Sequence, residues 1–386
     1  VRKSYKFRIY PNRRQERRLI QTLHGLRLLY NAALEQRRLA WRYNKKNLTV
    51  YEQINELPEL RRAFPEYREI YAQVLQDVLK RVDNAFKLFF RRLKNRNGKA
   101  GYPRYKNESR YDSFTYPQAY NGSVKFQGNR VWLSKIGSIR IKMHRQIQGN
   151  VKTVTVKHEG NHWYVIVSCD NIPKILLPPS NKKVGIDLGL INYATLSDGT
   201  TIENPRHLKR SLTKLKDAQR QLSKKTKGTS AYRKVKERVA KIHRKITNQR
   251  RDFLHKLSRK LINEYGTIVI ENLEVKRLLQ LKNGCRKQTK ALHREINAAG
   301  WSMFVSFLLY KAEEAGRRII QVDPAGTTRT CSRCGYMYPD HLPLSQRVFK
   351  CPKCGLKIDR DYNAAINILH KGLGQSLAAI ELQKSA

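Results

Sequence analysis

Alternation of apolar and polar residues with a period of two marks residues 1–10 and 123–169. Such alternation predicts half-buried β-strands. The triplet at 159–161, Glu-Gly-Asn, lies between two further apolar runs and indicates a hairpin turn. We therefore predict a small β-barrel or meander whose first strand is distant in sequence from the others. The apolar positions of its strands include Tyr5, Phe7, Ile9, Val124, Phe126, Val131, Leu133, Ile139 and Ile141.

Three helices are predicted between these strands, because apolar residues recur there every three or four positions. Asn12 followed by Gln15 indicates a capping box that opens the first helix. The second begins after Thr49 and ends before Pro58, and the third spans residues 65–94. The apolar faces of the first and third helices are predicted to be Leu19, Leu23, Leu26, Tyr30, Leu34 and Trp41, and Ile70, Val74, Val78, Val82, Phe86 and Phe89.

The segment at 98–106 (G-K-A-G-Y-P-R-Y-K) is rich in turn formers and alternates aromatic with basic residues. Rings that stack on bases and cations that meet phosphates suit a nucleic-acid contact. This pattern predicts that Tyr102, Arg104, Tyr105 and Lys106 bind nucleic acid. A solvated loop explains the segment equally well from sequence alone.

Three prolines, Pro173, Pro178 and Pro179, interrupt the strand pattern. We therefore place a domain boundary near residue 180. Beyond it, two buried-strand patterns each contain a carboxylate, Asp187 and Glu271. The predicted order of elements is a strand that carries Asp187, a hairpin, a pair of helices and a strand that carries Glu271. A helix, a further strand and a last helix with an aspartate follow. This is the order of an RNase H-like α/β sheet. The ranges are 184–189 and 192–196 for the hairpin, 205–260 for a basic helical pair, 267–271, 298–315 and 318–322.

Charge identifies the class of partner. The 386 residues include 79 Lys and Arg but 30 Asp and Glu, a formal net charge of +49. A field of this size attracts a polyanion and makes binding depend on salt. A charge surplus that serves solubility, or an affinity for anionic lipid, is the alternative, but the positive charge is spread over the whole chain, which favours nucleic acid. The helical pair at 205–260 carries almost only positive charge and is a predicted contact.

Neither a membrane nor a disulfide framework is expected. Residues 1–6, V-R-K-S-Y-K, contain no apolar signal-peptide core, and no stretch approaches the length of a membrane span. Four of the six cysteines have metal-binding spacing, while Cys169 and Cys285 have no cysteine partner nearby in the sequence. This usage fits a reducing cytosol.

Cys331-x-x-Cys334 and Cys351-x-x-Cys354 have the spacing of a zinc ribbon. Each Cys-x-x-Cys turn supplies two thiolates to one tetrahedral Zn²⁺. We predict a structural zinc site.

Asp187, Glu271 and Asp361 are the predicted catalytic residues and Mg²⁺ ligands. Phosphodiester hydrolysis requires an activated water and neutralisation of developing charge, which two divalent ions held by carboxylates provide. Each of the three carboxylates alone is a weak signal, since an aspartate in such a strand also caps loops or binds nucleotide sugars.

Asp359 is the alternative to Asp361 as the third carboxylate. Two residues apart on a helix, they cannot face the same site, and Asp359 suits the N-cap. Asn363 either braces the site or satisfies the helix terminus.

Several motifs together resemble the TnpB family, transposon-encoded RNA-guided nucleases related to type V CRISPR effectors. They are G-I-D-L-G at 185–189, I-E-N-L at 270–273, the two Cys-x-x-Cys-Gly turns and D-R-D-Y-N-A-A-I-N-I-L at 359–369. The likeness extends to Y-K-F-R-I-Y-P-N at 5–12 and to G-Y-P-R-Y-K, and thus covers nearly the whole chain. The three carboxylates match the family's catalytic triad, and the four cysteines match its zinc ligands.

The resemblance implies an α/β plus β-barrel architecture. Its parts would be a wedge β-barrel (1–10 and 115–180), a helical recognition block (11–114), a RuvC-like nuclease domain (181–330 and 355–386) and an inserted zinc ribbon (331–354). It also implies a guide RNA from the transposon end and cleavage of double-stranded DNA beside a short transposon-associated motif. We expect a monomer in the ribonucleoprotein, located in the prokaryotic cytosol near the nucleoid.

Two other functions remain open at this level: a repressor of the same fold that binds DNA without cutting, and a guide-independent nuclease or transposase. An intact triad counts against the first. Reading of the DNA motif is assigned to Gln73 and Gln76, because a glutamine amide can pair with adenine. A solvated helix face is the alternative for these two residues.

Overall fold

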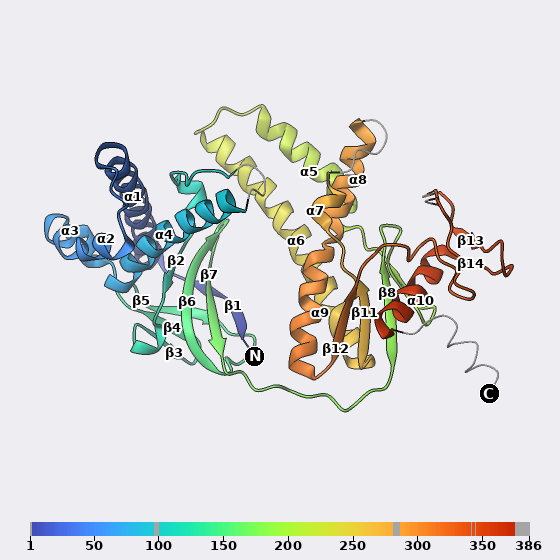
Figure 1. Ribbon diagram of the computed structural model, residues 1–386. Helices are drawn as coiled ribbons and strands as arrows, with labels where there is room; N and C mark the ends of the chain where they lie inside the picture. Colours follow the sequence, from blue (N-terminus) through green and yellow to red (C-terminus); the bar gives the residue numbers. More distant parts are fainter. Residues whose placement is uncertain (1, 96–99, 281–285, 341, 344, 375–386) are drawn as a thin grey trace. The chain divides into compact units, whose positions relative to one another are not determined.

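The computed structural model describes residues 2–95, 100–280, 286–340, 342–343 and 345–374 (Figure 1). It divides into two compact units between Pro173 and Lys174, and each unit has a β-sheet of its own. None of the described helices is both long enough and apolar enough to cross a membrane.

The first unit contains a curled, seven-stranded antiparallel sheet in the order β2-β6-β7-β1-β5-β4-β3. The chain's first strand lies in the middle, paired with β7 and β5. The predicted strands and the hairpin at 159–161 are present, but the described edge strands β2 and β3 do not pair, so the sheet is not a closed barrel. The strands are β1 (Lys3–Tyr10), β2 (Ser113–Tyr116), β3 (Val124–Gln127), β4 (Arg130–Leu133), β5 (Gly137–Lys142), β6 (Asn150–Glu159) and β7 (His162–Asp170).

Helices α1 (Arg13–Asn44), α2 (Val50–Asn55), α3 (Leu57–Ala63) and α4 (Ala72–Lys94) follow β1. A capping box at Asn12 opens α1, as predicted, and α2 begins after Thr49, as predicted, with a capping box that was not predicted. Each box satisfies backbone N–H groups that would otherwise lack partners at the start of a helix.

Two details of the helix predictions are wrong. The third helix begins at Ala72, and residues 65–69 form a separate 3₁₀ turn, η1 (Pro65–Glu69). Extended backbone at Ile70 separates the two, and the buried Ile70 side chain brings its Cδ1 within 3.2 Å of where a side chain at Gly25 would begin. Trp41, predicted on the apolar face of α1, is 59% exposed.

The second unit is built on a five-stranded sheet in the order β10-β9-β8-β11-β12. Strands β8, β11 and β12 are parallel, whereas β9 and β10 extend the sheet as antiparallel hairpin strands. The bounds are β8 (Lys183–Leu188), β9 (Asn192–Leu196), β10 (Thr201–Glu203), β11 (Thr267–Glu271) and β12 (Arg318–Val322).

Helices cover both faces of this sheet (Figure 1). One face packs through residues such as Ile186 and Ile270 against α6 and α9, whose Leu254 and Phe304 are fully buried. The other face packs through Val269 against Ile368 of α10. The helices are α5 (His207–Ser223), α6 (Ser230–Glu264), α7 (Val275–Leu278), α8 (Arg286–Ala299), α9 (Trp301–Ala315) and α10 (Arg360–Leu373).

The predicted helix at 298–315 is also wrong at its start. Gly300 adopts a left-handed conformation (φ +70°), which ends α8 and lets α9 begin at Trp301. Helix α8 itself was not predicted. The strand predicted at 318–322 is present as β12.

Glycines let α10 lie directly on the sheet. A Cβ at Gly185 of β8 would come within 2.2 Å of the Ala365 carbonyl oxygen, and one at Gly372 of α10 within 2.3 Å of Val269 Cγ1. No side chain fits at such distances without movement of the helix. The first glycine of the G-I-D-L-G motif therefore sets the distance between β8 and α10.

Replacement of Gly185 by Ala should destabilise the second unit by about 1–3 kcal/mol, because the added methyl group overpacks the contact between α10 and β8. Denaturant unfolding of the purified chain measures this change. Gly101→Ala is the matched control, since a Cβ there meets nothing within 4 Å. Equal midpoints for both variants would show that α10 is not held at this contact.

Candidate active site and metal centre

Asp187 and Glu271 end neighbouring parallel strands. Ile186 of β8 lies opposite Ile270 of β11, so the two carboxylates follow at the same level. Because side chains alternate along a strand, Asp187 projects on the same face as Gly185, the face that carries α10. Asp187 is partly buried and Glu271 is 8% exposed.

The first turn of α10 brings the third predicted carboxylate to this face. Asp359 is the N-cap and accepts a hydrogen bond from the Tyr362 backbone N–H (2.9 Å), as predicted. Asp361 lies in the first helical turn, where its Oδ2 is 3.8 Å from Nη1 of Arg347. The N-terminal end of a helix favours negative charge there.

The pKa values of all three carboxyl groups are raised, and that of Asp187 responds to the charges of the other two. Burial, followed by the nearby charges of Glu271 and Asp361, raises the pKa of Asp187 well above its usual value. Burial also raises the pKa of Glu271, against a lowering hydrogen bond from Thr327. Burial and then the charge of Asp359 raise the pKa of Asp361. Charged carboxylates are thus unfavourable in this site unless a cation neutralises them.

Buried polar side chains connect Glu271 to α10. Thr327 Oγ1 donates a hydrogen bond to Glu271 Oε1 (2.6 Å). Asn367 of α10 in turn holds this segment, because its Nδ2 donates to the carbonyl oxygens of Thr327 (2.8 Å) and Thr330 (2.6 Å). The segment that carries Thr327 therefore cannot move independently of α10.

Asn363 braces the adjoining residues, which decides between its two sequence interpretations. Its Nδ2 donates to the Thr330 carbonyl oxygen (2.8 Å), and its Oδ1 accepts from the Ser332 N–H (2.9 Å). The side chain is fully buried. These bonds fix the chain on both sides of Cys331.

Sequence reasoning missed Thr327 and Asn367. Asn367 lies one helical turn after Asn363, so the i,i+4 repeat of asparagines was an available signal. No sequence signal marked Thr327, because its contact with Glu271 joins residues 56 positions apart.

The four predicted zinc ligands form one cluster. Sγ of Cys331 lies 3.6 Å from that of Cys354, and Sγ of Cys334 lies 3.5 Å from that of Cys351. Tetrahedral Zn–S bonds of about 2.3 Å place sulfurs about 3.8 Å apart, so the cluster fits this ion. Among the residues that the structure describes, it is the one group of three or more His, Cys, Asp or Glu whose ligand atoms lie within 4.8 Å.

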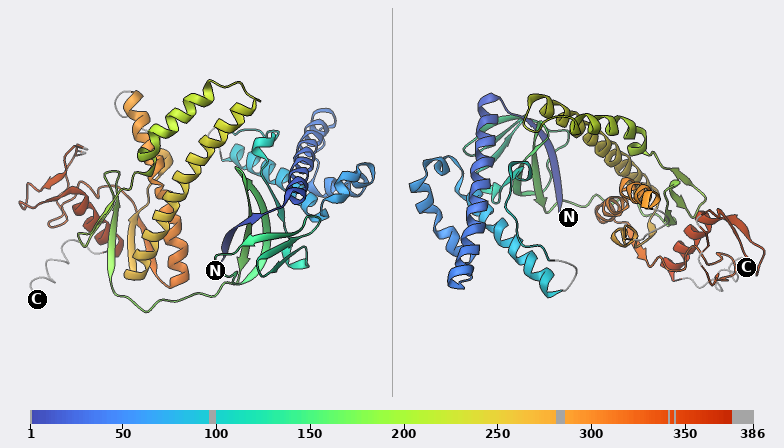
Figure 2. Two further views of the ribbon diagram at one scale, coloured as in Figure 1. Left: turned by 180° about the vertical axis from the view of Figure 1, so that it is seen from behind. Right: turned by 90° about the horizontal axis from the view of Figure 1, so that it is seen from above.

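The two Cys-x-x-Cys turns have the same backbone form. Gly335 N–H donates to the Cys331 carbonyl oxygen and Gly355 N–H to that of Cys351, both at 3.0 Å, and both glycines have positive φ. The second turn connects the paired strands β13 (Val348–Lys350) and β14 (Lys357–Asp359), and β14 leads directly into α10 (Figure 2). Cys169 is buried in β7 of the first unit, and Cys285 lies outside the described residues.

The predicted nucleic-acid residues occupy two places in the first unit. Gln73 and Gln76 lie in the first turns of α4, where Gln73 Nε2 donates to Gln118 Oε1 (2.6 Å). Gln76 borders a groove of about 680 Å³ that also contains basic side chains. Those side chains are Arg61, Arg62, Arg68 and Lys135.

The segment around Tyr102 lies against α1 and the later part of α4. The ring of Tyr102 contacts Phe89, and Tyr105 accepts a hydrogen bond from Arg38 (2.6 Å). Lys106 is held through its backbone by the Asn31 side chain, and Arg104 is exposed. The segment is thus attached to α1 rather than freely solvated. The structure does not bring these four residues together with Gln73 and Gln76.

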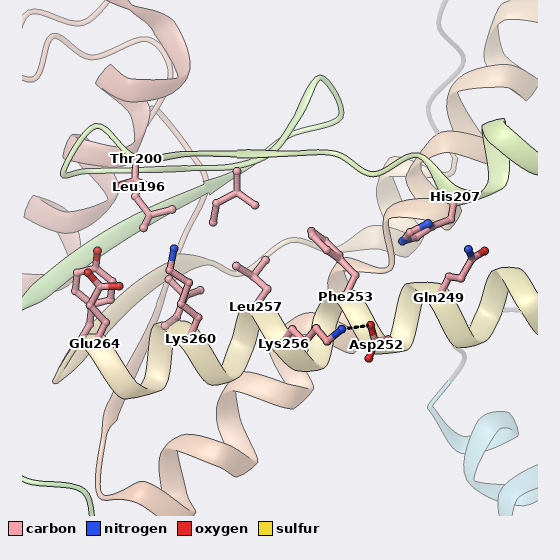
Figure 3. A pocket seen from close by; sticks show the side chains of 13 residues that line it. Leu196, Thr200, His207, Gln249, Asp252, Phe253, Lys256, Leu257, Lys260 and Glu264 are labelled. Carbon is pink, nitrogen blue, oxygen red and sulfur yellow. Dashed lines mark ion pairs between the residues drawn. The ribbon is translucent and has the colours of Figure 1, made fainter.

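A cleft of about 690 Å³ lies between α6 and the β9–β10 hairpin (Figure 3). It opens on the sheet face opposite to Asp187, because Leu196 lines it and pairs with Ile186 rather than with Asp187. Its walls are mainly apolar, and Lys256 at its edge is paired with Asp252 (2.8 Å). No predicted site residue lines this cleft.

Three family profiles match the chain. "Probable transposase" matches residues 166–282, and "Cas12f1-like, TNB domain" matches residues 301–368, which include the cysteine cluster. "Helix-turn-helix domain" matches residues 1–46, but in this structure that segment contains strand β1 and the single helix α1.

Two curated relatives span almost the whole chain. "Putative RNA-guided DNA endonuclease" of Streptomyces pristinaespiralis is 34% identical over 383 residues, with 97% of this chain and 90% of the relative covered. "Putative RNA-guided DNA endonuclease InsQ" of Escherichia coli K12 is 31% identical over 378 residues, with 96% and 92% covered.

Among solved structures, a Cas12f1–sgRNA–target DNA complex aligns with a TM-score of 0.54 over 92% of this chain and 82% of that chain. At 17% sequence identity this likeness concerns the fold alone. The two curated relatives are closer to this chain in sequence than the solved structure is. Their names agree with the family indicated by the sequence motifs. This chain belongs to the TnpB family of RNA-guided DNA endonucleases.

Proposed function

We propose that this chain is an RNA-guided endonuclease that cleaves double-stranded DNA beside a short transposon-associated motif. A guide RNA from the transposon end would read sequence by base pairing, while the protein reads only the motif and the backbone shape. The observation that carries the proposal is the convergence of Asp187, Glu271 and Asp361, from two strands and a helix, on one face of the sheet.

The three carboxylates suit two Mg²⁺ ions. They offer hard oxygen ligands, their raised pKa values indicate repulsion that a cation would relieve, and they are spread more widely than the single-ion cysteine cluster. Bound there, the ions would activate water and neutralise charge on the phosphate. Thr327 and the cap of α10 keep Glu271 and Asp361 in place. The order of strands and helices supports an RNase H-like, RuvC-type assignment, in which a single site cuts both strands in succession.

The cysteine cluster would hold a structural Zn²⁺. Such ions supply folding free energy directly. Because Asn363 joins the backbone beside Cys331 to α10, the zinc site would help to fix the helix that carries Asp361.

Binding of RNA and DNA would rest on the net charge of +49. The α5–α6 pair, whose charged residues are almost all Lys or Arg, is one proposed phosphate contact. Gln76, beside the basic groove at the start of α4, is a proposed reader of the DNA motif together with Gln73. Tyr102, Arg104, Tyr105 and Lys106 are proposed RNA contacts. We expect one protein chain in each ribonucleoprotein.

One experiment tests the function as a whole. The protein is purified from cells that carry its transposon, the bound RNA is sequenced, and the complex is given Mg²⁺ and a target next to a randomised motif library. Guided cleavage beside a restricted set of motifs is expected. Guided binding without cleavage would identify a repressor, and cleavage that ignores the RNA sequence would identify a guide-independent nuclease.

Asp361→Ala should lower the cleavage rate more than about 100-fold, because residues that merely support metal ligands already cost 10–100-fold when lost. Guided DNA binding should persist, since it depends on phosphate contacts. Asp359→Ala, the matched variant, removes the helix cap and a neighbouring negative charge but no predicted metal ligand. Faster cleavage by Asp361→Ala than by Asp359→Ala would reverse the assignment of the two residues.

Thr327→Val should raise the Mg²⁺ concentration needed for half-maximal cleavage by about 10-fold or more. The substitution removes the hydrogen bond that orients Glu271 and opposes the rise in its pKa. Thr327→Ser keeps the hydroxyl group and should behave like the unchanged protein. An identical Mg²⁺ requirement in the Val variant would mean that this bond does not position Glu271.

Cys351→Ser should reduce zinc content below one ion per chain and lower the melting temperature of the second unit. Elemental analysis and thermal unfolding measure the two effects. Cys169→Ser alters a buried cysteine outside the cluster and should leave zinc content unchanged. Active, pure protein without zinc would contradict a structural role for the metal.

A further inference from the structure

The apolar face of α4 continues beyond the core of the first unit. Val82 is fully buried, but Phe86 and Phe89, one and two turns later, are only half-buried, and Phe90 is 56% exposed. Apolar surface of this kind on a charged protein marks a binding site. The residues that surround it indicate what it binds.

Four rings contact one another here, and a fifth ring, three residues along the chain from Tyr102, contacts a guanidinium group. The ring of Tyr102 meets Phe86 edge-on (centroids 5.6 Å apart, 89°) and Phe89 (5.3 Å, 70°), and Phe90 contacts both (6.4 and 5.2 Å). Tyr105 lies under the guanidinium group of Arg38 (5.4 Å). We call Phe86, Phe89, Phe90, Tyr102, Tyr105 and Arg38 the aromatic surface.

The aromatic surface is formed before any partner binds. Behind Phe86 the guanidinium group of Arg37 lies 5.4 Å from the ring and pairs with Asp83 (3.1 Å). The Asn31 side chain makes two hydrogen bonds to the backbone of Lys106, which anchors the segment that carries both tyrosines. Preformed rings lose little conformational entropy when a ligand stacks on them.

Charge excludes a second copy of the chain as the favoured partner. Arg91, Arg92 and Lys94 end α4 beside Phe90 and are exposed, while Glu35 offsets only part of the charge of Arg38. Two such surfaces would repel each other. Nucleic acid offers phosphates to the cations and base faces to the rings. Base faces are accessible only where nucleotides are unpaired.

We propose that the aromatic surface binds unpaired nucleotides of the RNA by stacking. RNA is favoured over a displaced DNA strand because exposed rings promote aggregation unless a long-lived partner covers them, and a guide stays bound before and after each DNA target. This inference rests on the proposed function, since it assigns a place to the guide. It adds α4 residues that the sequence pattern assigned to a buried helix face.

Phe90→Leu tests stacking directly, because it keeps an apolar side chain and removes the ring. The full-length chain, freed of RNA, is titrated with a fluorescent, unstructured single-stranded RNA. We expect Kd to rise about 5- to 100-fold, the range for loss of one stacked base. Phe90→Trp should restore binding. The dependence of Kd on salt should keep its slope, because no phosphate contact is lost.

Tyr120→Leu is the matched control, since this tyrosine is 62% exposed elsewhere in the first unit, and its Kd should not change. Duplex RNA and single-stranded DNA of equal length serve as further probes. Three outcomes of Phe90→Leu would overturn the proposal. They are an equal loss of affinity for duplex RNA, a loss of affinity confined to single-stranded DNA, and an unchanged Kd for single-stranded RNA. A change in molar mass of the RNA-free chain in Phe90→Leu would also overturn it, since this would identify a contact between copies.

The reconstituted complex separates this inference from the proposed function. If Phe90→Leu binds RNA normally and guided cleavage proceeds, only the assignment of the aromatic surface fails. If the unchanged protein with its guide does not cleave DNA, the proposed function fails, whatever the aromatic surface binds.

Discussion

The contact of α10 with β8 and β11 is the constraint on which the second unit depends. The helix lies so near the sheet that Gly185 and Gly372 have no room for a side chain. This distance brings the first turn of α10, and with it Asp361, close enough to Asp187 for the two charges to interact. A larger residue at either glycine would displace the helix and separate the carboxylates. The glycine of the G-I-D-L-G motif thus has a packing role, distinct from that of the aspartate beside it.

The same helix joins the carboxylates to the cysteine cluster. Asn363 and Asn367 project from consecutive turns of α10 and hold the segment from Thr327 to Ser332 through its backbone. One end of that segment donates to Glu271, and the other enters the first Cys-x-x-Cys turn. Buried amides satisfied in this way are rigid, because leaving any of these groups unpaired is costly. The cysteine cluster and the carboxylate site are therefore parts of one hydrogen-bonded assembly.

The first unit depends on long-range strand pairing and carries a strongly basic surface. Its sheet buries β1 among strands that follow it by more than a hundred residues, and its helices extend from this sheet with basic and aromatic side chains at the surface. The chain has few acidic residues to neutralise its positive charge, and a bound polyanion would relieve the repulsion among the cations. The proposed stacking on Phe90 and Tyr105 would add selectivity to that charge, because charge alone would not distinguish unpaired nucleotides from a duplex.

Local rules let the sequence by itself determine much of this protein. The capping box at Asn12, the helix start after Thr49, the N-cap Asp359 and the two Cys-x-x-Cys turns each involve residues a few positions apart, so their spacing was sufficient. The motif resemblance to the TnpB family was confirmed by curated relatives that match nearly the whole chain. Only tertiary structure decided the break before α4, the exposure of Trp41 and Phe90, and the bond between Thr327 and Glu271. Each of these depends on which distant segment packs against the residue, and no local pattern records that contact.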